Sequence, residues 1–252
     1  MISRAEKCGQ TMHLENLRKT GTMISCAREE DAVIVSTPKP IETVLAGLEG
    51  ESPVFLVGCN LCAAACRVGG ERETRAMAEA LGLRGLEVAG RRVLDGACNA
   101  RKTQRDLVSC REELARARSV LVLACGGGAQ SVLSALERIG FDRLPVHPGA
   151  DTLMQAEQSG PADFEQFCSL CGECRLDDFG GICPATRCAK GLLNGPCGGS
   201  AGGRCEVFPD HPCAWALIGE RLLRMGRLER IERIVPPRPA DPRAHPRRLR
   251  RS

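Results

Sequence analysis

Sixteen cysteines in 252 residues constrain this chain more than any other feature of its sequence. Eight of them, with nine glycines, lie between residues 168 and 213, where apolar residues follow neither a helical nor a strand period. Such a density indicates disulfides in an exported protein, but residues 1–22 are polar and charged and lack the apolar core of a signal peptide. We therefore expect a cytoplasmic protein whose cysteines bind metal rather than pair with one another.

Charge and hydropathy exclude two further classes of protein. The formal charge of +4 is small, and most of the excess comes from arginines in the last ten residues. With only 3% aromatic residues, the chain lacks the basic face interleaved with aromatics that binds nucleic acid. No segment reaches eighteen consecutive apolar residues, so we expect no membrane insertion.

Short apolar runs alternate with amphipathic segments between residues 31 and 160, which predicts an α/β domain. The runs at 53–57 and 119–124 are continuously apolar, as in strands of a parallel sheet that is covered on both faces. We expect a small doubly wound parallel sheet. Its predicted strands are 32–36, 53–57, 86–94, 119–124 and 144–147, and its predicted helices are 40–48, 70–81, 103–117 and 130–139.

Three other regions flank or follow this domain. Residues 1–30 form an extension without a clear pattern, in which Cys8, His13 and Cys26 are the only candidate ligands. Residues 161–235 are predicted to form an irregular Cys/Gly-rich metal-cluster domain that contains a short helix at 213–225. Residues 236–252 form a basic Pro/Arg tail that we expect to be disordered.

The C-terminal cysteines have the spacing of iron–sulfur ligands. Three of them form a C-x2-C-x2-C triplet, and a fourth precedes a proline, as in bacterial ferredoxins, although the gap before it is longer here. Together with four later cysteines they allow two four-cysteine sites: the candidate ligands are Cys168, Cys171, Cys174, Cys183, Cys188, Cys197, Cys205 and Cys213. Two alternatives to a pair of iron–sulfur clusters remain: one cluster together with one zinc ion, or zinc ions alone. His211 is a candidate zinc ligand that we expect to lie in a surface loop.

A second group of cysteines follows the ends of the predicted strands. Cys59, Cys62 and Cys66 come directly after the strand at 53–57, while Cys98 and Cys125 follow the next two strands. The carboxyl ends of parallel strands meet at one edge of a sheet, where open α/β folds bind ligands. We expect a cluster held by the triplet with either Cys98 or Cys125 as its fourth ligand. Cys110, within a predicted helix, is not a candidate.

No other motif points to catalysis or to nucleotide binding. Gly126, Gly127 and Gly128 follow a strand, but the dinucleotide pattern G-x-G-x-x-G and a phosphate-loop lysine are both missing. No Ser/His/Asp set or carboxylate pair stands out.

Taken together, these cysteine motifs resemble one known family. The runs that carry the resemblance are Cys168-Ser-Leu-Cys-Gly-Glu-Cys, Gly180-Gly-Ile-Cys-Pro-Ala-Thr-Arg-Cys and Val57-Gly-Cys-Asn-Leu-Cys. They are similar to the methylenetetrahydrofolate reductase C-terminal family, which includes the MetV-type accessory subunits, and the similarity covers about residues 34–237. The chain departs from the family at Asp151, where members usually carry asparagine.

The resemblance implies a non-catalytic iron–sulfur subunit that passes electrons to a flavin-bearing barrel subunit of MetF type. Two or three 4Fe–4S clusters, with zinc in one site as an option, are the implied cofactors, and the electron donor is unspecified. This chain is too short to add the eight βα repeats of a barrel to the elements above. The rival hypotheses are a zinc module that scaffolds a partner or senses redox state, and an independent enzyme acting on a one-carbon carrier in the cleft at the sheet edge.

Overall fold

A parallel four-stranded sheet forms the centre of the N-terminal half. The computed structural model describes residues 34–158, 160 and 163–236. The sheet has the order β3-β2-β4-β5, and every neighbouring pair in it is parallel. Its strands are β2 (Val54–Cys59), β3 (Val88–Leu94), β4 (Ser119–Leu123) and β5 (Val146–Pro148).

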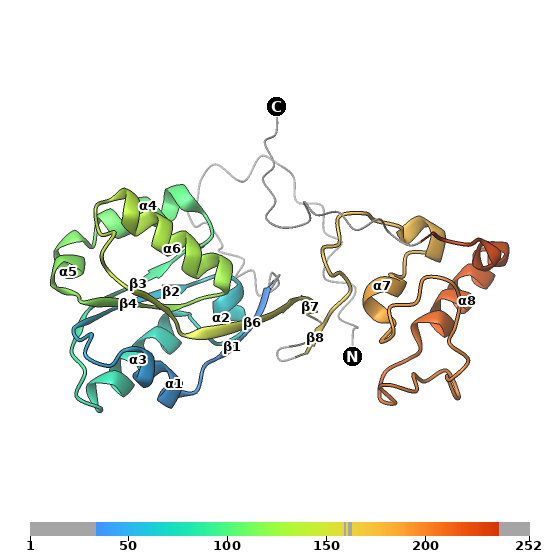
Figure 1. Cartoon of the computed structure of the whole chain (residues 1–252), viewed down its shortest axis with the longest axis horizontal. Coiled ribbons are helices and arrows are strands. Elements are labelled where there is room, and N and C mark those ends of the chain that lie inside the picture. Colours follow the sequence, from blue (N-terminus) through green and yellow to red (C-terminus); the bar gives the residue numbers. More distant parts are fainter. Residues whose placement is uncertain (1–33, 159, 161–162, 237–252) are drawn as a thin grey trace, which may run out of the picture.

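Helices cover both faces of this sheet, which confirms the doubly wound parallel arrangement (Figure 1). α1 (Ile41–Gly47) and α3 (Glu71–Gly82) lie on one face, and α4 (Ala100–Val108), α5 (Arg111–Arg116) and α6 (Gly126–Arg138) lie on the other. Successive residues of β2 point to opposite faces of the sheet. Leu56 belongs to the hydrophobic cluster on the side of α1 and α3, and Phe55 belongs to the cluster on the side of α4, α5 and α6. Both side chains are fully buried, and each such burial contributes about 1.5–3 kcal/mol.

The first predicted strand does not join the parallel sheet. β1 (Ile34–Pro38) instead pairs antiparallel with β6 (Ala150–Gln155), a strand that the sequence did not predict. β6 follows β5 after the single residue Gly149, and it provides the partner for β1. Asp151, the residue that departs from the family pattern, forms an ion pair with Lys39 beside this ribbon.

The predicted helix 103–117 is wrong as a single element, because the chain breaks it into α4 and α5. The carbonyl of Asp106 accepts hydrogen bonds from Ser109 Oγ (2.7 Å) and Cys110 Sγ (3.4 Å). The Cys110 amide then bonds to Leu107 instead of Asp106, since side chains compete with the backbone for this carbonyl. α6 also differs from its prediction: it begins at Gly126, so the three glycines form its first turn rather than a loop.

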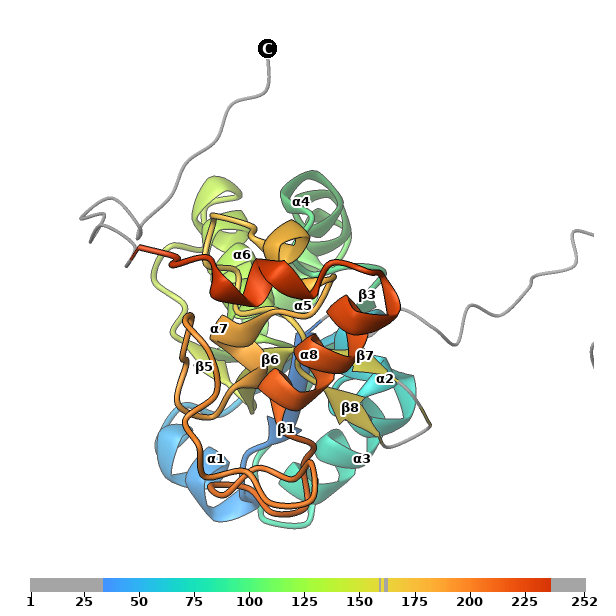
Figure 2. The ribbon, with the colours of Figure 1, turned by 90° about the vertical axis from the view of Figure 1, so that its right-hand side faces the viewer.

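The C-terminal part of the chain consists of short elements joined by loops (Figure 2). Its longest element, α8 (Ala214–Arg224), confirms the predicted helix. α8 packs Trp215 edge-on against Phe179, with 5.7 Å between the ring centroids, and buries Ile218 and Leu222 completely. The remaining elements are β7 (Glu157–Gln158), β8 (Phe164–Glu165), η3 (Leu176–Phe179), α7 (Pro184–Arg187) and η4 (Leu228–Glu232).

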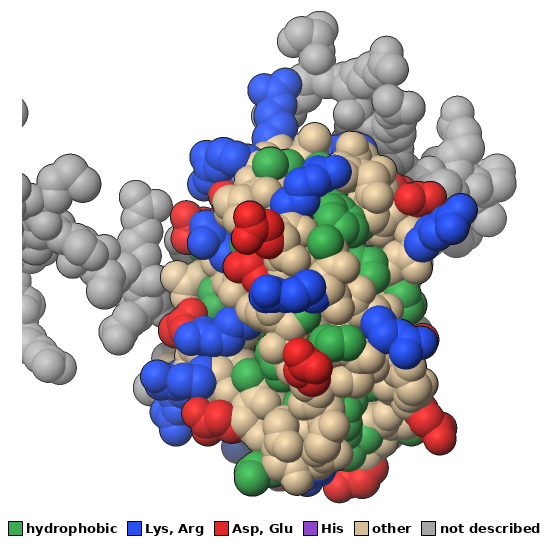
Figure 3. All heavy atoms as spheres, turned by 90° about the vertical axis from the view of Figure 1, so that its left-hand side faces the viewer, with side chains coloured by type: hydrophobic (Ala, Val, Ile, Leu, Met, Phe, Trp, Pro, Cys, Tyr) green, Lys and Arg blue, Asp and Glu red, His purple; other side chains and the backbone are tan. Residues whose placement is uncertain are grey.

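Basic and acidic side chains alternate on the face of the α/β part shown in Figure 3, without a patch of one sign. Among the described residues, no helix has the length and apolar character needed to cross a membrane. The predictions for Cys8, His13, Cys26 and the tail from residue 237 lie outside the described residues.

Gly69 marks the closest approach between the loop after β2 and the end of β4. A Cβ atom there would lie 1.7 Å from the carbonyl oxygen of Leu123, whose backbone cannot move aside cheaply. We expect Gly69→Ala to lower the free energy of unfolding by at least about 1–3 kcal/mol, measured by urea unfolding of the reduced, metal-free protein. In the matched control Gly82→Ala the new Cβ meets no atom within 4 Å. An equal effect of the two substitutions would contradict this account.

Candidate metal centres

The first group of cysteines lies at the point where the strand order of the sheet reverses. From β2 the chain moves outward to β3 and then crosses back to β4 on the other side of β2. β2 ends at Cys59, and Cys125 lies two residues beyond the end of β4. Open α/β sheets bind ligands in the crevice at this switch point, so the fold places two sulfurs where a ligand is expected.

A short helix that the sequence did not predict brings two more sulfurs to the same edge. α2 (Cys62–Ala65) carries Cys62 at its start, and Cys66 caps its end. Beyond α2 the chain returns to the sheet, where the Gly69 carbonyl accepts the Cys59 amide at 2.7 Å. The Cys66 thiol donates a hydrogen bond to the carbonyl of Ile34 in β1 at 3.7 Å, which connects α2 to the β1–β6 ribbon.

The electrostatics of these thiols show that they are neighbours. Burial raises the pKa of Cys59, and the backbone amides of Ala97 and Leu61 oppose that shift, while nearby Cys125 and Cys62 add to it. Burial likewise raises the pKa of Cys66, with smaller contributions of the same sign from Cys62 and Cys125. Deprotonating Cys59 and Cys66 is therefore unfavourable without a cation, and a bound metal would reverse this preference. We call Cys59, Cys62, Cys66 and Cys125 the sheet-edge set.

Cys98 and Cys110 differ from the sheet-edge set. Cys98 is exposed, just before the N-cap of α4, and the residue before it, Ala97, donates its amide to Cys59 Sγ at 3.5 Å. Of the two candidates for the fourth position, Cys125 is thus the one with an electrostatic interaction with the triplet. Cys110 is buried in the core.

Four cysteines from the C-terminal half line one cavity of ≈ 20 Å³. We call Cys188, Cys197, Cys205 and Cys213 the cavity set. Cys188 caps the end of α7 and Cys213 caps the start of α8, so the two helices fix the positions of two of these sulfurs. Trp215 closes the cavity from α8 and donates its indole N–H to the Leu192 carbonyl at 3.1 Å.

An ion pair that the sequence did not indicate lies at the same cavity. Glu206 accepts a hydrogen bond from Cys197 Sγ at 3.4 Å and pairs with Lys190. The hydrogen bond from Lys190 lowers the pKa of Glu206, and the same contact raises the pKa of Lys190. The carboxylate packs directly over Gly199, whose amide donates to Cys197 Sγ at 3.5 Å. Cys197 therefore has a backbone donor on one side and a carboxylate acceptor on the other.

The remaining four cysteines lie in and beside the loop before η3. The loop bends at Leu170, which adopts a positive φ of 58°, and the Leu170 amide donates to Cys168 Sγ at 3.4 Å. Thr186 connects this loop to α7: its hydroxyl donates to Ser169 Oγ at 3.2 Å and accepts from Cys183 Sγ at 3.6 Å. We call Cys168, Cys171, Cys174 and Cys183 the loop set.

The three sets group the cysteines by position, and this grouping does not itself show that their side chains are arranged as metal ligands. Across residues 34–158, 160 and 163–236, no three His, Cys, Asp or Glu side chains adopt a metal-ligating arrangement. None of the fourteen described cysteines is joined to another in a disulfide. The assignment of metals and of ligand sets therefore stays a prediction. His211 is exposed with its ring against Phe208, which agrees with its predicted place in a surface loop.

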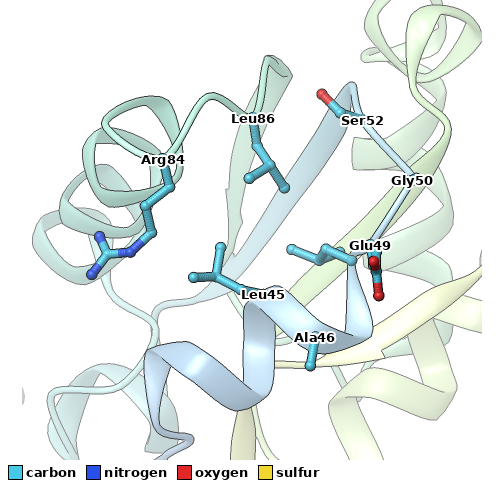
Figure 4. Close-up of a pocket in the computed structure, with 8 residues that line it drawn as sticks. Leu45, Ala46, Glu49, Gly50, Ser52, Arg84 and Leu86 are labelled. Carbon is cyan, nitrogen blue, oxygen red and sulfur yellow. The ribbon is translucent and has the colours of Figure 1, made fainter.

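A further hollow lies at the opposite end of the strands and lacks these features. It is lined by α1 and by the segments that precede β2 and β3, including Leu45, Ser52, Arg84 and Leu86 (Figure 4). Its lining contains no cysteine, and the charged groups of Arg84 and Glu49 lie apart at its rim. We therefore do not assign the chemistry of the chain to this hollow.

Comparison with known families bears on the part of the chain that holds the cavity and loop sets. Residues 147–241 match the family model described as methylene-tetrahydrofolate reductase C terminal. The likeness to that family covers the C-terminal part of the chain. The match confirms the resemblance predicted from the sequence and begins within β5, so the sheet-edge set lies outside it. No curated protein and no solved structure matches the chain.

The raised pKa of Cys59 gives a testable pH dependence. A raised pKa means that the unreactive thiol form persists to higher pH, so alkylation of Cys59 in the reduced, metal-free protein should be half-maximal above about pH 8.5. Mass spectrometry after brief iodoacetamide pulses measures each site, and exposed Cys98 provides the accessible control that should react faster at pH 8. Reaction of Cys59 as fast as Cys98 at that pH would contradict the assignment.

Proposed function

We propose that this chain is an accessory iron–sulfur subunit of a methylenetetrahydrofolate reductase-type complex and passes electrons to a flavin-bearing barrel subunit. The observation that supports the proposal is the placement of the cysteines: four line one cavity and four lie in and beside one loop of the family-matched segment, while Cys59 interacts with Cys62 and Cys125 at the sheet edge. Four thiolates are the usual ligand complement of a 4Fe–4S cluster. Such clusters supply one-electron transfer when bound, which a flavin partner requires.

The residues around the sulfurs support iron–sulfur chemistry in particular. At least one cysteine of each set accepts a backbone amide: Cys59 from Ala97, Cys168 from Leu170 and Cys197 from Gly199. Amide donors favour the thiolate over the thiol, and hydrogen bonds to cluster sulfurs help to set reduction potentials. Lys190 adds a positive charge beside the cavity set, where four thiolates would otherwise repel one another.

A zinc site is the second candidate for the cavity set alone. Its four sulfurs line a cavity of only ≈ 20 Å³, a size that suits a single ion. Four-cysteine closed sites are typical of structural zinc. In this alternative the chain would hold iron at the other two sets and use zinc to join α7 and α8.

Removal of single thiols tests the grouping. We expect Cys171→Ser, in protein purified without oxygen, to lose about four iron atoms per chain and a corresponding part of the absorption near ~400 nm. Cys110→Ser is the matched control, because Cys110 is buried, lies outside the three sets and should change neither quantity. Iron and zinc are measured together by plasma mass spectrometry. A colourless protein with zinc only, or equal losses in both variants, would contradict the proposal.

The partner is tested by reconstitution. The loaded chain, mixed with a flavin-bearing methylenetetrahydrofolate reductase barrel from the same source, should co-elute with it in gel filtration. Reduced chain should then bleach the flavin absorption of the barrel. Failure of both observations with a fully iron-loaded chain would remove the proposed partner.

A further inference from the structure

Ser36 carries a buried hydroxyl without a hydrogen-bond partner among the described residues. The residue is 5% exposed, and its Oγ is one of two buried side-chain polar atoms in that part of the chain that lack a partner. A buried polar group that makes no hydrogen bond is unfavourable, and native proteins contain few of them. We therefore expect the Ser36 hydroxyl to donate a hydrogen bond to a ligand bound beside it.

A β-bulge in the ribbon directs this hydroxyl inward. Val35 pairs with Met154 but Ser36 pairs with Thr152, so Leu153 has no partner and is 60% exposed. In a regular strand consecutive side chains point to opposite faces, yet Val35 and Ser36 are both buried. Bulges frequently reorient a side chain next to a functional site.

Ser36 lies next to cysteines of the sheet-edge set. The Ser36 amide donates to Cys66 Sγ, and the same sulfur donates to the carbonyl of Ile34 two residues earlier. Thr152, the cross-strand partner of Ser36 on the same face, accepts the amide of Gly126 at 2.7 Å. Gly126 follows Cys125, so Ser36 lies between the chain segments that carry Cys66 and Cys125.

We propose that the Ser36 hydroxyl donates a hydrogen bond to a sulfur of the metal cluster bound by Cys59, Cys62, Cys66 and Cys125. Ser36 is thus a positioning residue that raises the reduction potential of this centre, because a donor stabilises the more negative, reduced state. This inference rests on the proposed function. It also accounts for the unpartnered hydroxyl, which in the loaded protein has its acceptor.

The test is a redox titration of oxygen-free, iron-loaded protein followed by electron paramagnetic resonance. The sheet-edge centre is identified as the signal that Cys62→Ser removes. We expect Ser36→Ala to lower the midpoint of that signal alone, by about a tenfold change in the ratio of reduced to oxidised centre at a fixed potential, or about 59 mV. Ser36→Thr keeps a hydroxyl and should retain most of the potential. Thr37→Ala, at the exposed next position, is the matched control and should change nothing.

The outcomes separate this inference from the proposed function. If the wild-type chain binds no iron, both fail. If it binds iron and the Cys62-dependent signal keeps its midpoint in Ser36→Ala, only the role of Ser36 is overturned. Equal shifts of every signal would also overturn it.

A second measurement examines the protein without metal. Removing an unpartnered hydroxyl should leave the urea midpoint of metal-free Ser36→Ala equal to that of wild type or higher. A clear decrease would show that the hydroxyl has a structural partner in the fold itself, which contradicts the assignment of its proton to the cluster.

Discussion

The close approach of cysteine sulfurs is the interaction on which the proposed account depends. Buried thiols resist ionisation, as the raised pKa values of Cys59 and Cys66 indicate, and thiolates held side by side repel one another. Without a cation these buried thiols keep their protons, and a bound cation would favour their thiolate forms. The backbone amides on Cys59, Cys168 and Cys197 act in the same direction, since they favour the thiolate form.

Two different kinds of scaffold achieve this approach. At the sheet edge, the parallel strands β2 and β4 bring Cys59 and Cys125 together through the topology of the fold, with an extensive hydrophobic core beneath them. Among the described residues of the C-terminal part, apolar packing comes from a small cluster around Trp215 and Phe179. Loops with positive φ angles, such as those at Gly198 and Gly203, complete the path of the chain there. We expect the C-terminal part to depend on metal for its stability more than the sheet does.

The sequence predicted those features that depend on local patterns. Continuous apolar runs located β2 and β4, and the position of cysteines after strands predicted that Cys59 and Cys125 lie at the same edge of the sheet. Other features depend on contacts between distant residues and carry no local signal. The β1–β6 ribbon, its bulge at Ser36, and the ion pair between Lys190 and Glu206 belong to this class. The break at Cys110 was missed because two side chains compete for one carbonyl, a choice that helical periodicity does not reveal.

Mössbauer spectroscopy of the chain, produced in medium enriched in ⁵⁷Fe and purified without oxygen, tests the central claim most directly. The account predicts quadrupole doublets typical of 4Fe–4S clusters, with an iron content of about four atoms for each occupied four-cysteine set. Zinc in place of iron at all three sets, with no cluster doublet, would contradict it.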